Sequence, residues 1–272
     1  MAELERTGER TGERPGELTG EVALITGAGQ GIGEVVAARF VRAGAAVVVL
    51  DVNGRAAESV AARIGHAIAV EADVTSESDL ERAWAAAREA FSDVSIVVNN
   101  AITCCDADFL DISRAEWSRD IAVTLTGAFL TAKLALPAMI AAGRGVIINM
   151  SSVNALSYFG NESYSAAKAG LLSLTRSLAV RFGPDGIRAN AIVPGTIVTP
   201  VWDHRISADP DVLDKALAWY PSTRLGRSED VAEAALYLAS DRAAWVNGVA
   251  LPVDGGLLAG NIRLARDIVP EQ

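Results

Sequence analysis

Cysteine and histidine are scarce in this chain of 272 residues, which contains two of each. The two cysteines, Cys104 and Cys105, are neighbours in the sequence and cannot cross-link distant segments. Structural zinc sites take their ligands from pairs of cysteines and histidines at short spacings, and this sequence lacks such pairs. The composition therefore argues against a disulfide framework and a metal centre, and we expect a reducing compartment, the cytoplasm.

Positive charge is also in short supply, since 24 lysines and arginines stand against 34 aspartates and glutamates, a net charge of -10. Nucleic-acid binders neutralise phosphates with lysine and arginine, so this balance argues against a general binder of DNA or RNA. Hydrophobic residues make up 50% of the chain. They fall in short runs, none of which reaches the roughly 18 apolar residues of a membrane span. We therefore expect a sizeable core and no nucleic-acid or membrane partner.

The two ends of the chain differ in composition from the rest. Residues 7–10 read Thr-Gly-Glu-Arg and are repeated at once as residues 11–14. Such a stretch buries little apolar surface and lacks the apolar core of a secretory signal, so residues 1–19 are predicted to form a disordered tail. A docking role for this segment is the alternative. Residues 263–272 are expected to form a second tail.

Between these tails, β-branched runs alternate with alanine-rich stretches of helical length. The predicted strands cover residues 22–25, 47–50, 67–70, 96–98, 146–149, 189–193 and 249–253. The predicted helices cover residues 32–43, 55–64, 77–91, 114–142, 163–182 and 229–239. Each strand run is apolar on both faces, as in parallel strands covered by helices on both sides. The pattern predicts an α/β fold, a single Rossmann-like doubly wound parallel sheet of about seven strands with helices on both faces, over residues 20–262.

Residues 196–227 interrupt this alternation directly after a predicted strand, and we expect them to form a lid over a site. They carry Trp202, His204, Trp219 and Tyr220. The aromatic side chains would line an apolar substrate pocket or pack the lid itself. His204 would contact the substrate or lie on the surface, and both alternatives stay open.

The first predicted strand runs into a cluster of glycines, where the chain reads Thr-Gly-Ala-Gly-Gln-Gly-Ile-Gly from Thr26 to Gly33. A helix is predicted to begin inside this cluster. Glycines permit a tight turn and let the backbone approach a pyrophosphate, which binds at the positive amino end of a helix. Because the cluster opens the first β-α-β unit, it predicts a dinucleotide site.

Asp51 ends the second predicted strand, 18 residues after Gly33. A carboxylate there can bind both hydroxyls of the adenosine ribose and would repel a 2'-phosphate, so NAD is preferred over NADP. Arg55 lies close by and keeps NADP open. Asp51 could instead cap the following helix, although Asn53 could do so equally well. Asp73, at the end of the third strand, would touch the adenine or cap a helix.

Tyr164 and Lys168 are four residues apart in a predicted helix, so their side chains lie on one face. A free tyrosine titrates near 10, and acting as a base near neutral pH asks for a shift of roughly three units, about 4 kcal/mol. An ammonium about 4 Å away, in a site of effective dielectric ~20, supplies roughly that much. The spacing alone is also that of an ordinary helix face, so its context has to decide.

That context is a series of short motifs in a fixed order. They are Thr26 to Gly33, Asp73-Val74, Asn99-Asn100-Ala101, Ser151-Ser152, Tyr164 to Lys168, Pro194-Gly195 with Thr199, and Val253 to Gly256. In this order and spacing the chain resembles the short-chain dehydrogenase/reductases from about residue 19 to residue 259. The resemblance implies an NAD-dependent oxidoreductase that moves hydride between the nicotinamide and a secondary alcohol or ketone. It also implies a homo-oligomer, a tetramer or a dimer.

The resemblance assigns roles to single residues. Tyr164 would exchange the proton of the substrate oxygen as general acid/base, Ser152 would hydrogen-bond that oxygen, and Lys168 would lower the tyrosine pKa and hold the nicotinamide ribose. Ser152 precedes Tyr164 by 12 residues, one fewer than is commonest in the family, so Ser151 is kept as an alternative. The implied cofactor contacts are Gly27, Gln30, Gly31, Ile32, Gly33, Asp51, Val52, Asp73, Val74, Asn100, Ala101, Tyr164, Lys168, Pro194, Gly195, Ile197 and Thr199, with Asn99 beside them. The candidate substrate contacts are Ser152, Asn154, Cys104, Trp202 and His204, although the cysteines could equally serve as small hydrophobic residues.

Two departures from the family pattern bear on catalysis. Thr124 stands where the family usually has an asparagine that helps to hold a water in a proton relay to the lysine, and it offers a hydroxyl but no amide. Ile102 follows Asn-Asn-Ala, where the family has glycine. These departures leave open a catalytically weak NAD(H)-binding sensor or scaffold, and also a dehydratase or epimerase of the same fold. The joint presence of Ser152, Tyr164 and Lys168 argues against a pure binder.

Overall fold

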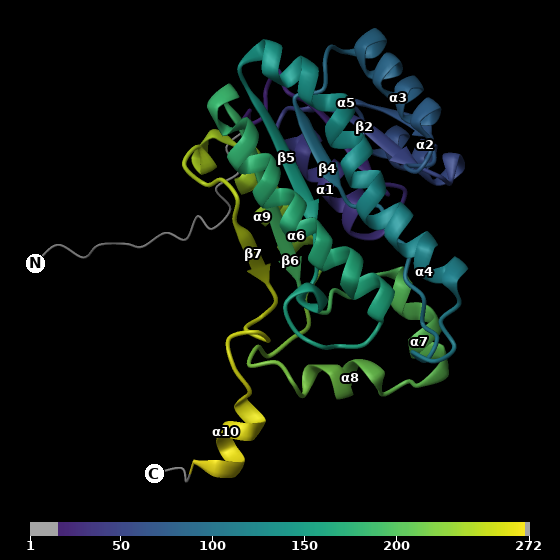
Figure 1. The fold of residues 1–272 in the computed structure, drawn as a ribbon, viewed down its shortest axis with the longest axis vertical. Coiled ribbons are helices and arrows are strands. Elements are labelled where there is room, and N and C mark those ends of the chain that lie inside the picture. Colours follow the sequence, from purple (N-terminus) through teal and green to yellow (C-terminus); the bar gives the residue numbers. More distant parts are fainter. Residues whose placement is uncertain (1–15, 270–272) are drawn as a thin grey trace, which may run out of the picture.

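The computed structural model describes residues 16–269 and contains a sheet of seven strands (Figure 1). The strands are β1 (Val22–Thr26), β2 (Ala46–Asp51), β3 (Ala67–Glu71), β4 (Ile96–Asn99), β5 (Gly145–Met150), β6 (Ile187–Pro194) and β7 (Ala250–Val253). Their order across the sheet is β3-β2-β1-β4-β5-β6-β7, and all neighbours are parallel. The order reverses between β1 and β4, and such a reversal leaves a crevice at the carboxyl ends of the two strands.

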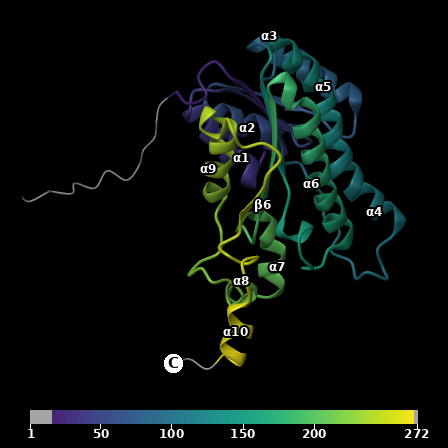
Figure 2. The ribbon, with the colours of Figure 1, turned by 60° about the vertical axis from the view of Figure 1, so that its left-hand side comes forward.

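Helices cover both faces of this sheet (Figures 1 and 2). On one face lie α1 (Gly31–Arg42), α2 (Gly54–Ile64) and α9 (Ser228–Ala239), and on the other lie α3 (Glu77–Ala90), α5 (Gly127–Ala142) and α6 (Glu162–Phe182). In β1, Ala23 and Ile25 join the apolar cluster of the first face, whereas Val22 and Leu24 join that of the second. Successive residues of a strand point to opposite faces, so a strand that is apolar throughout is buried on both sides. The predicted doubly wound parallel sheet is confirmed.

The predicted long helix over residues 114–142 is one helical stretch with a wider turn inside it. It consists of α4 (Arg114–Ile121), a π-helical turn η1 (Ala122–Thr126) and α5. A capping box starts it, because Ser113 Oγ accepts from Glu116 N while the Glu116 carboxylate accepts from Ser113 N. Length and mean hydropathy (1.5 over 18 residues) would allow the stretch to cross a membrane. It packs against α3, β4 and β5, and 44% of that 18-residue window is buried within the described structure.

The interrupting segment 196–227 lies beyond the carboxyl edge of the sheet. It contains η4 (Pro200–Trp202), α7 (Asp203–Ala208) and α8 (Val212–Leu217), and the two α-helices lie at the foot of the sheet in Figure 1. A short parallel bridge between Ile197 and Gly226 joins the two ends of the segment. The segment therefore returns to its starting point, and its role as a lid stays a prediction.

The disordered tail predicted at residues 1–19 extends too far. Residues 1–15 and 270–272 lie outside the described residues, but residues 16–19 form a turn in which Leu18 is buried in the α1 cluster. The Leu18 backbone N–H donates to Ala43 O (2.9 Å). At the other end α10 (Ile262–Ile268) is helical and is capped by Asn261, whose side chain accepts from Leu264 N. A single buried leucine and one short helix are too little pattern to be found from composition.

Candidate active site

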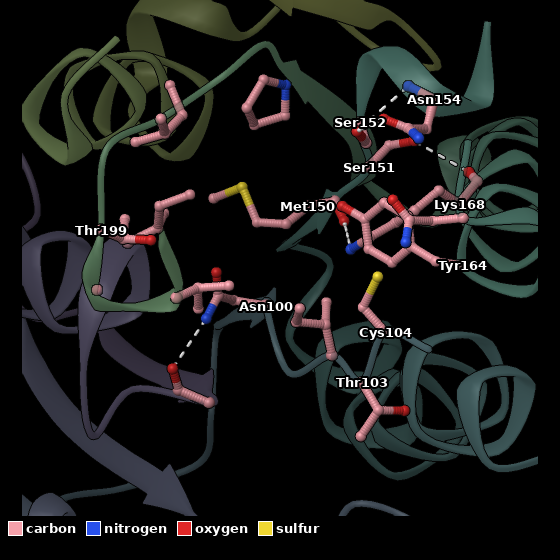
Figure 3. Close-up of a pocket in the computed structure, with 18 of the residues that line it drawn as sticks. Asn100, Thr103, Cys104, Met150, Ser151, Ser152, Asn154, Tyr164, Lys168 and Thr199 are labelled. Atoms are coloured by element: carbon pink, nitrogen blue, oxygen red, sulfur yellow. Dashed lines mark hydrogen bonds between the residues drawn. The ribbon is translucent and has the colours of Figure 1, made fainter. Parts of the chain in front are cut away.

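A cavity of about 1410 Å³ opens where the strand order reverses between β1 and β4 (Figure 3). Residues from the carboxyl ends of β1, β2, β4, β5 and β6 line it, together with residues of α1, α6 and the lid segment. Small-molecule pockets commonly measure ~300–1,000 Å³, so this cavity has room for a dinucleotide and a second small molecule. Within residues 16–269 no group of three or more histidine, cysteine, aspartate or glutamate side chains that could hold a metal ion occurs.

The glycine cluster forms the turn between β1 and α1. Gly27 and Gly31 have φ angles of 62° and 61°, left-handed values that glycine adopts without strain. A Cβ at Gly33 would lie 2.4 Å from Gly27 O, so a glycine is required for α1 to pack against the turn. The N-cap residue of α1, Gln30, makes no side-chain capping bond. The amino end of the helix is therefore available to the pyrophosphate of a dinucleotide.

Two carboxylates line the cavity at the ends of β2 and β3. Asp51 Oδ2 accepts from Gly29 N (2.9 Å) and its Oδ1 accepts from Asn53 N (2.9 Å), which fixes the carboxylate beside the glycine turn. Asn53, not Asp51, caps α2. Asp73 likewise is not a helix cap, because Ser76 caps α3. Both carboxylates line the cavity and could reach the ribose or the adenine of a dinucleotide.

Asn100 faces the cavity from the end of β4, and Asn99 does not. Asn100 Nδ2 donates to Thr26 O (3.1 Å) and to Gly27 O (2.9 Å), which ties β4 to the glycine turn. Asn99 is buried, and its Nδ2 donates to Asn149 Oδ1 (2.8 Å) in the layer between the sheet and α5. The prediction that Asn99 lines the cofactor is therefore wrong. Side chains alternate along a strand, and this alternation turns Asn99 into the core.

Ser152, Tyr164 and Lys168 lie together on the cavity wall (Figure 3). Lys168 Nζ lies 5.3 Å from the centre of the Tyr164 ring. Lys168 is 2% exposed, and its ammonium donates to Met150 O at the end of β5. The Ser152 hydroxyl donates to Asn154 Oδ1 (3.1 Å) and also interacts with Tyr164, where it favours the phenolate.

Ser151 has a different position from Ser152. Its hydroxyl donates to the backbone oxygen of Lys168 (2.9 Å), which anchors the loop after β5 to α6. Ser152 is thus the serine that interacts with the tyrosine, and the loop that is one residue shorter than usual does not change this.

The pKa values of Tyr164 and Lys168 shift in directions that favour the neutral forms of both groups. Burial raises the pKa of Tyr164 to about 12, against the opposing effect of the Ser152 hydroxyl. Burial lowers the pKa of Lys168 to about 7. Burial has the largest effect on the pKa of Tyr164 in the protein without cofactor, so the lowering of that pKa by Lys168 stays a prediction. A cation beside the phenol, such as an oxidised nicotinamide, would favour the phenolate.

Most of the residues predicted for the site line the cavity. These are Gly27, Gln30, Gly31, Ile32, Asp51, Val52, Asp73, Val74, Asn100, Ala101, Cys104, Ser152, Asn154, Tyr164, Lys168, Pro194, Gly195, Ile197, Thr199 and Trp202. Gly33 lies behind the turn, and Thr124 is 2% exposed inside η1, where its hydroxyl has no partner in the described part of the chain. His204 is exposed on α7, and Arg205 lines the cavity in its place. Of the two alternatives for His204, the structure favours the surface position, because neighbouring helical side chains point ~100° apart and Arg205 is the one that faces the cavity.

Several cavity residues escape sequence reasoning because they come from irregular segments. Phe159 and Asn161 precede α6, Arg205 belongs to the lid, and Leu257 and Leu258 follow β7. No periodic pattern marks such positions. One signal was available, since a Gly-Asn pair at 160–161 favours a turn. Asn161 indeed has a left-handed φ of 55°, which no other non-glycine residue has in the described part of the chain.

Large aromatic side chains also contribute to the cavity lining. They are those of Phe159, Trp202 and Trp219, with Trp219 half exposed. The Tyr220 hydroxyl accepts from Thr196 N (2.6 Å) and so holds the lid segment in place. Burial and the neighbouring carboxylates of Asp106 and Asp120 raise the pKa of the Cys104 thiol to about 12, so this cysteine acts as a small neutral side chain.

The chain is similar to known proteins over most of its length. Residues 27–258 match a family model described as enoyl-(acyl carrier protein) reductase. An uncharacterized oxidoreductase of Schizosaccharomyces pombe is 42% identical over 251 residues, which is 92% of this chain and 95% of that protein. The 2,5-dichloro-2,5-cyclohexadiene-1,4-diol dehydrogenase LinX of Sphingobium indicum is 39% identical, over 88% of this chain and 96% of that protein. A crystal structure of an oxidoreductase of the short chain dehydrogenase/reductase family from Burkholderia thailandensis superposes with a TM-score of 0.88 at 39% identity, over 93% of this chain and 99% of that one.

Proposed function

Because this chain belongs to the short-chain dehydrogenase/reductase family, we propose that it transfers hydride between NAD(H) and a secondary alcohol or ketone. The family identifies it as an oxidoreductase that uses a nicotinamide cofactor, NAD or NADP. The choice of cofactor, the class of substrate and the roles of single residues are our proposal. One observation carries it: Ser152, Tyr164 and Lys168 line the same cavity as the glycine turn and Asp51.

NAD is the proposed cofactor because of Asp51. Its carboxylate is fixed by Gly29 N and Asn53 N, and it stands on the cavity wall. A fixed carboxylate can accept hydrogen bonds from two ribose hydroxyls but repels a 2'-phosphate. Arg55, the residue that kept NADP open in the sequence, is not among the cavity-lining residues. The charge at this position therefore supports NAD over NADP.

The proposed chemistry places a proton donor and acceptor at the substrate oxygen. Tyr164 gives its hydroxyl proton to the ketone oxygen during reduction and takes the alcohol proton during oxidation, while Ser152 donates a hydrogen bond to that oxygen. Lys168 stabilises the phenolate in its charged form, and Met150 O holds its ammonium in place. The bound nicotinamide supplies or accepts the hydride. The aromatic side chains of the cavity lining would exclude water from the reacting carbon.

Turnover and cofactor choice can be measured together. Purified protein is mixed with a panel of secondary alcohols and either NAD or NADP, and formation of the reduced cofactor is followed at 340 nm. We expect turnover with NAD and at least tenfold lower kcat/KM with NADP, the order expected when one hydrogen-bonded charge distinguishes two ligands. Faster turnover with NADP would contradict the cofactor assignment.

Replacing Tyr164 with phenylalanine tests the proton transfer. General acid-base catalysis is worth about 10²- to 10⁴-fold, so Tyr164→Phe should lower kcat by that factor. Binding of NADH, measured by quenching of protein fluorescence, should stay within about twofold of the wild type, because the hydroxyl contributes little to it. Exposed Tyr158 offers a control, and Tyr158→Phe should leave kcat unchanged. Equal turnover by Tyr164→Phe and wild type would refute the assignment.

A second candidate function is a sensor or scaffold that binds NAD(H) with little turnover. The observation in its favour is Thr124, a buried hydroxyl in η1 at the position where a side-chain amide is expected. Quenching by NADH without turnover over a broad panel of alcohols and ketones would support this candidate. A dehydratase or epimerase of the same fold would instead convert its substrate without net change in the cofactor.

A further inference from the structure

The loop after β4 is attached to three other elements of the structure at Cys105 and Asp106. Cys105 N donates to Asp120 Oδ2 (2.9 Å) on α4, and Cys105 O accepts from Asn161 Nδ2 (3.0 Å) just before α6. Asp106 Oδ1 accepts from the same Asn161 nitrogen (2.8 Å) and from Arg205 on the lid helix α7 (2.6 Å). One carboxylate oxygen thus connects the loop, the start of α6 and the lid.

Asn161 is held in a backbone conformation that serves this contact. Its φ of 55° is left-handed, a region that asparagine enters more readily than most residues but still at a cost. That conformation allows its side-chain amide to donate to both Cys105 O and Asp106 Oδ1. A strained residue whose side chain makes two interloop bonds indicates that the arrangement is specified by the surrounding structure.

The opposite side of the loop is anchored in the core. Asp120 is fully buried, and its Oδ2 accepts from Ser163 Oγ (2.6 Å) as well as from Cys105 N. Ser163 directly precedes Tyr164. Through Asp120, the loop is therefore fixed relative to the residue that we propose as the general acid/base.

The lid side of the contact leads to the substrate end of the cavity. Arg205 and Asn161 both line the cavity, whereas Asp106 does not. The Arg205 guanidinium lies over the Trp202 ring, 5.2 Å from its centre, and Trp202 is itself a cavity residue. The positive charge of Arg205 also acts on the Cys104 thiol, which faces Tyr164 in Figure 3. Asp106 lies outside the cavity and holds two residues of the cavity wall, Asn161 and Arg205, in place.

We propose that Asp106 is a positioning residue for substrate binding, which closes the lid by drawing Arg205 and Asn161 onto one carboxylate oxygen. The proposal rests on the proposed function, because it assigns the enclosed end of the cavity to the alcohol or ketone. The Asp106–Arg205 pair is partly exposed, with side chains 58% and 40% accessible, so a lone ion pair there would contribute little. Its effect comes from the shared oxygen, since loss of Asp106 releases the lid and Asn161 together.

Steady-state kinetics of Asp106→Ala give the first test. We expect KM for the alcohol to rise about 5- to 30-fold, the range for losing hydrogen bonds to a charged acceptor at a partly exposed site. The kcat should change less than threefold and NADH quenching less than twofold, because the proton-transfer residues and the adenosine end are untouched. Asp106→Asn keeps a hydrogen-bond acceptor without the charge, so its KM should lie between the KM values of the wild type and Asp106→Ala.

A matched control is Asp93→Ala, which removes the carboxylate from the exposed Arg88–Asp93 pair on the surface near β4. This variant should keep the wild-type KM. The double variant Asp106→Ala/Arg205→Gln should be no worse than the poorer single variant, because both changes break one connection. In 0.5 M NaCl the KM of the wild type should rise by less than the substitution Asp106→Ala raises it, since salt screens the Asp106–Arg205 pair but leaves the hydrogen bond from Asn161 to Asp106.

Limited proteolysis provides a readout that does not depend on turnover. With subtilisin and no cofactor, we expect Asp106→Ala to be cleaved between residues 203 and 217 at least several times faster than wild type and Asp93→Ala. Unchanged KM together with unchanged cleavage in Asp106→Ala would overturn the proposal. If no alcohol is turned over by the wild type, the proposed function fails, while faster cleavage of the lid would still support the role of Asp106.

Discussion

Lys168 is the residue where burial and charge conflict most directly. It is 2% exposed, and among the described hydrogen bonds its ammonium has the single acceptor Met150 O. Burial lowers its pKa to about 7 from an ordinary value of 10.5. The side chain therefore reduces the stability of the fold whenever the unfolded chain is protonated and the folded one is not. A residue kept in such a position is expected to serve binding or catalysis.

This cost predicts a pH dependence of stability. Between pH 7 and about 9.5 the unfolded chain carries a proton on Lys168 that the folded protein has lost, so the folded state gains stability as pH rises. The free energy of unfolding of the wild type, relative to Lys168→Met, should increase by up to ~1.4 kcal/mol per pH unit over this window. Urea unfolding without cofactor at pH 7, 8 and 9 measures it. A difference that does not vary with pH would contradict the prediction.

The turn between β1 and α1 decides, at the level of secondary-structure elements, whether a dinucleotide can bind. Gly27, Gly31 and Gly33 let strand, turn and helix approach more closely than side chains would permit. Asn100 fixes the turn from β4 by donating to Thr26 O and Gly27 O. The cofactor site is thus a product of how two neighbouring strands end.

Gly33→Ala should disturb this packing. The added Cβ would lie 2.4 Å from Gly27 O and 2.6 Å from Asn100 Nδ2, both held in hydrogen bonds. We expect a loss of about 1–3 kcal/mol in the free energy of unfolding, typical of overpacking, and at least tenfold weaker NADH binding. Gly183→Ala is the control, because its Cβ would meet only Asn247 Nδ2 at 3.4 Å. Wild-type NADH affinity in Gly33→Ala would contradict this account of the turn.

At the scale of the whole molecule, the helical stretch that contains α4, η1 and α5 has exposed apolar side chains. Trp117, Phe129 and Ile140 are each about two-fifths to one-half exposed. Fewer than half of the residues in the most apolar 18-residue window are buried within the described chain. Exposed apolar surface of this kind is commonly buried against a partner. We therefore propose that α5 packs against a second copy of this chain.

Mass in solution tests this proposal. Light scattering after size exclusion should give a mass about four times the 28.4 kDa of one chain for a tetramer, or about two times 28.4 kDa for a dimer. Phe129→Glu places a charge in the proposed interface and should shift the protein to a smaller species, because a buried unpaired charge is costly. A wild-type monomer at micromolar concentration would rule the association out.

The sequence alone predicted the layered sheet and much of the site. Strand runs apolar on both faces, separated by alanine-rich helical stretches, leave few arrangements other than a doubly wound parallel sheet, and the predicted boundaries lie within two residues of the observed ones. The glycine turn and Asp51 were predicted from their place in the first β-α-β unit. Ser152, Tyr164 and Lys168 were predicted from the order of motifs along the whole chain, and all of these residues or segments line one cavity.

Tertiary structure decided what depends on contacts between distant segments. Asn99 and Asn100 are adjacent, yet strand alternation turns one into the core and the other toward the cavity. On the short helix α7, His204 points to solvent while its neighbour Arg205 lines the cavity. Asp106 accepts hydrogen bonds from Asn161 and Arg205, which lie 55 and 99 residues further along the chain. The pKa of Lys168 depends on how deeply α6 is buried. Burial and interloop bonds are properties of the packed chain, because they arise only when separate segments exclude water from one another.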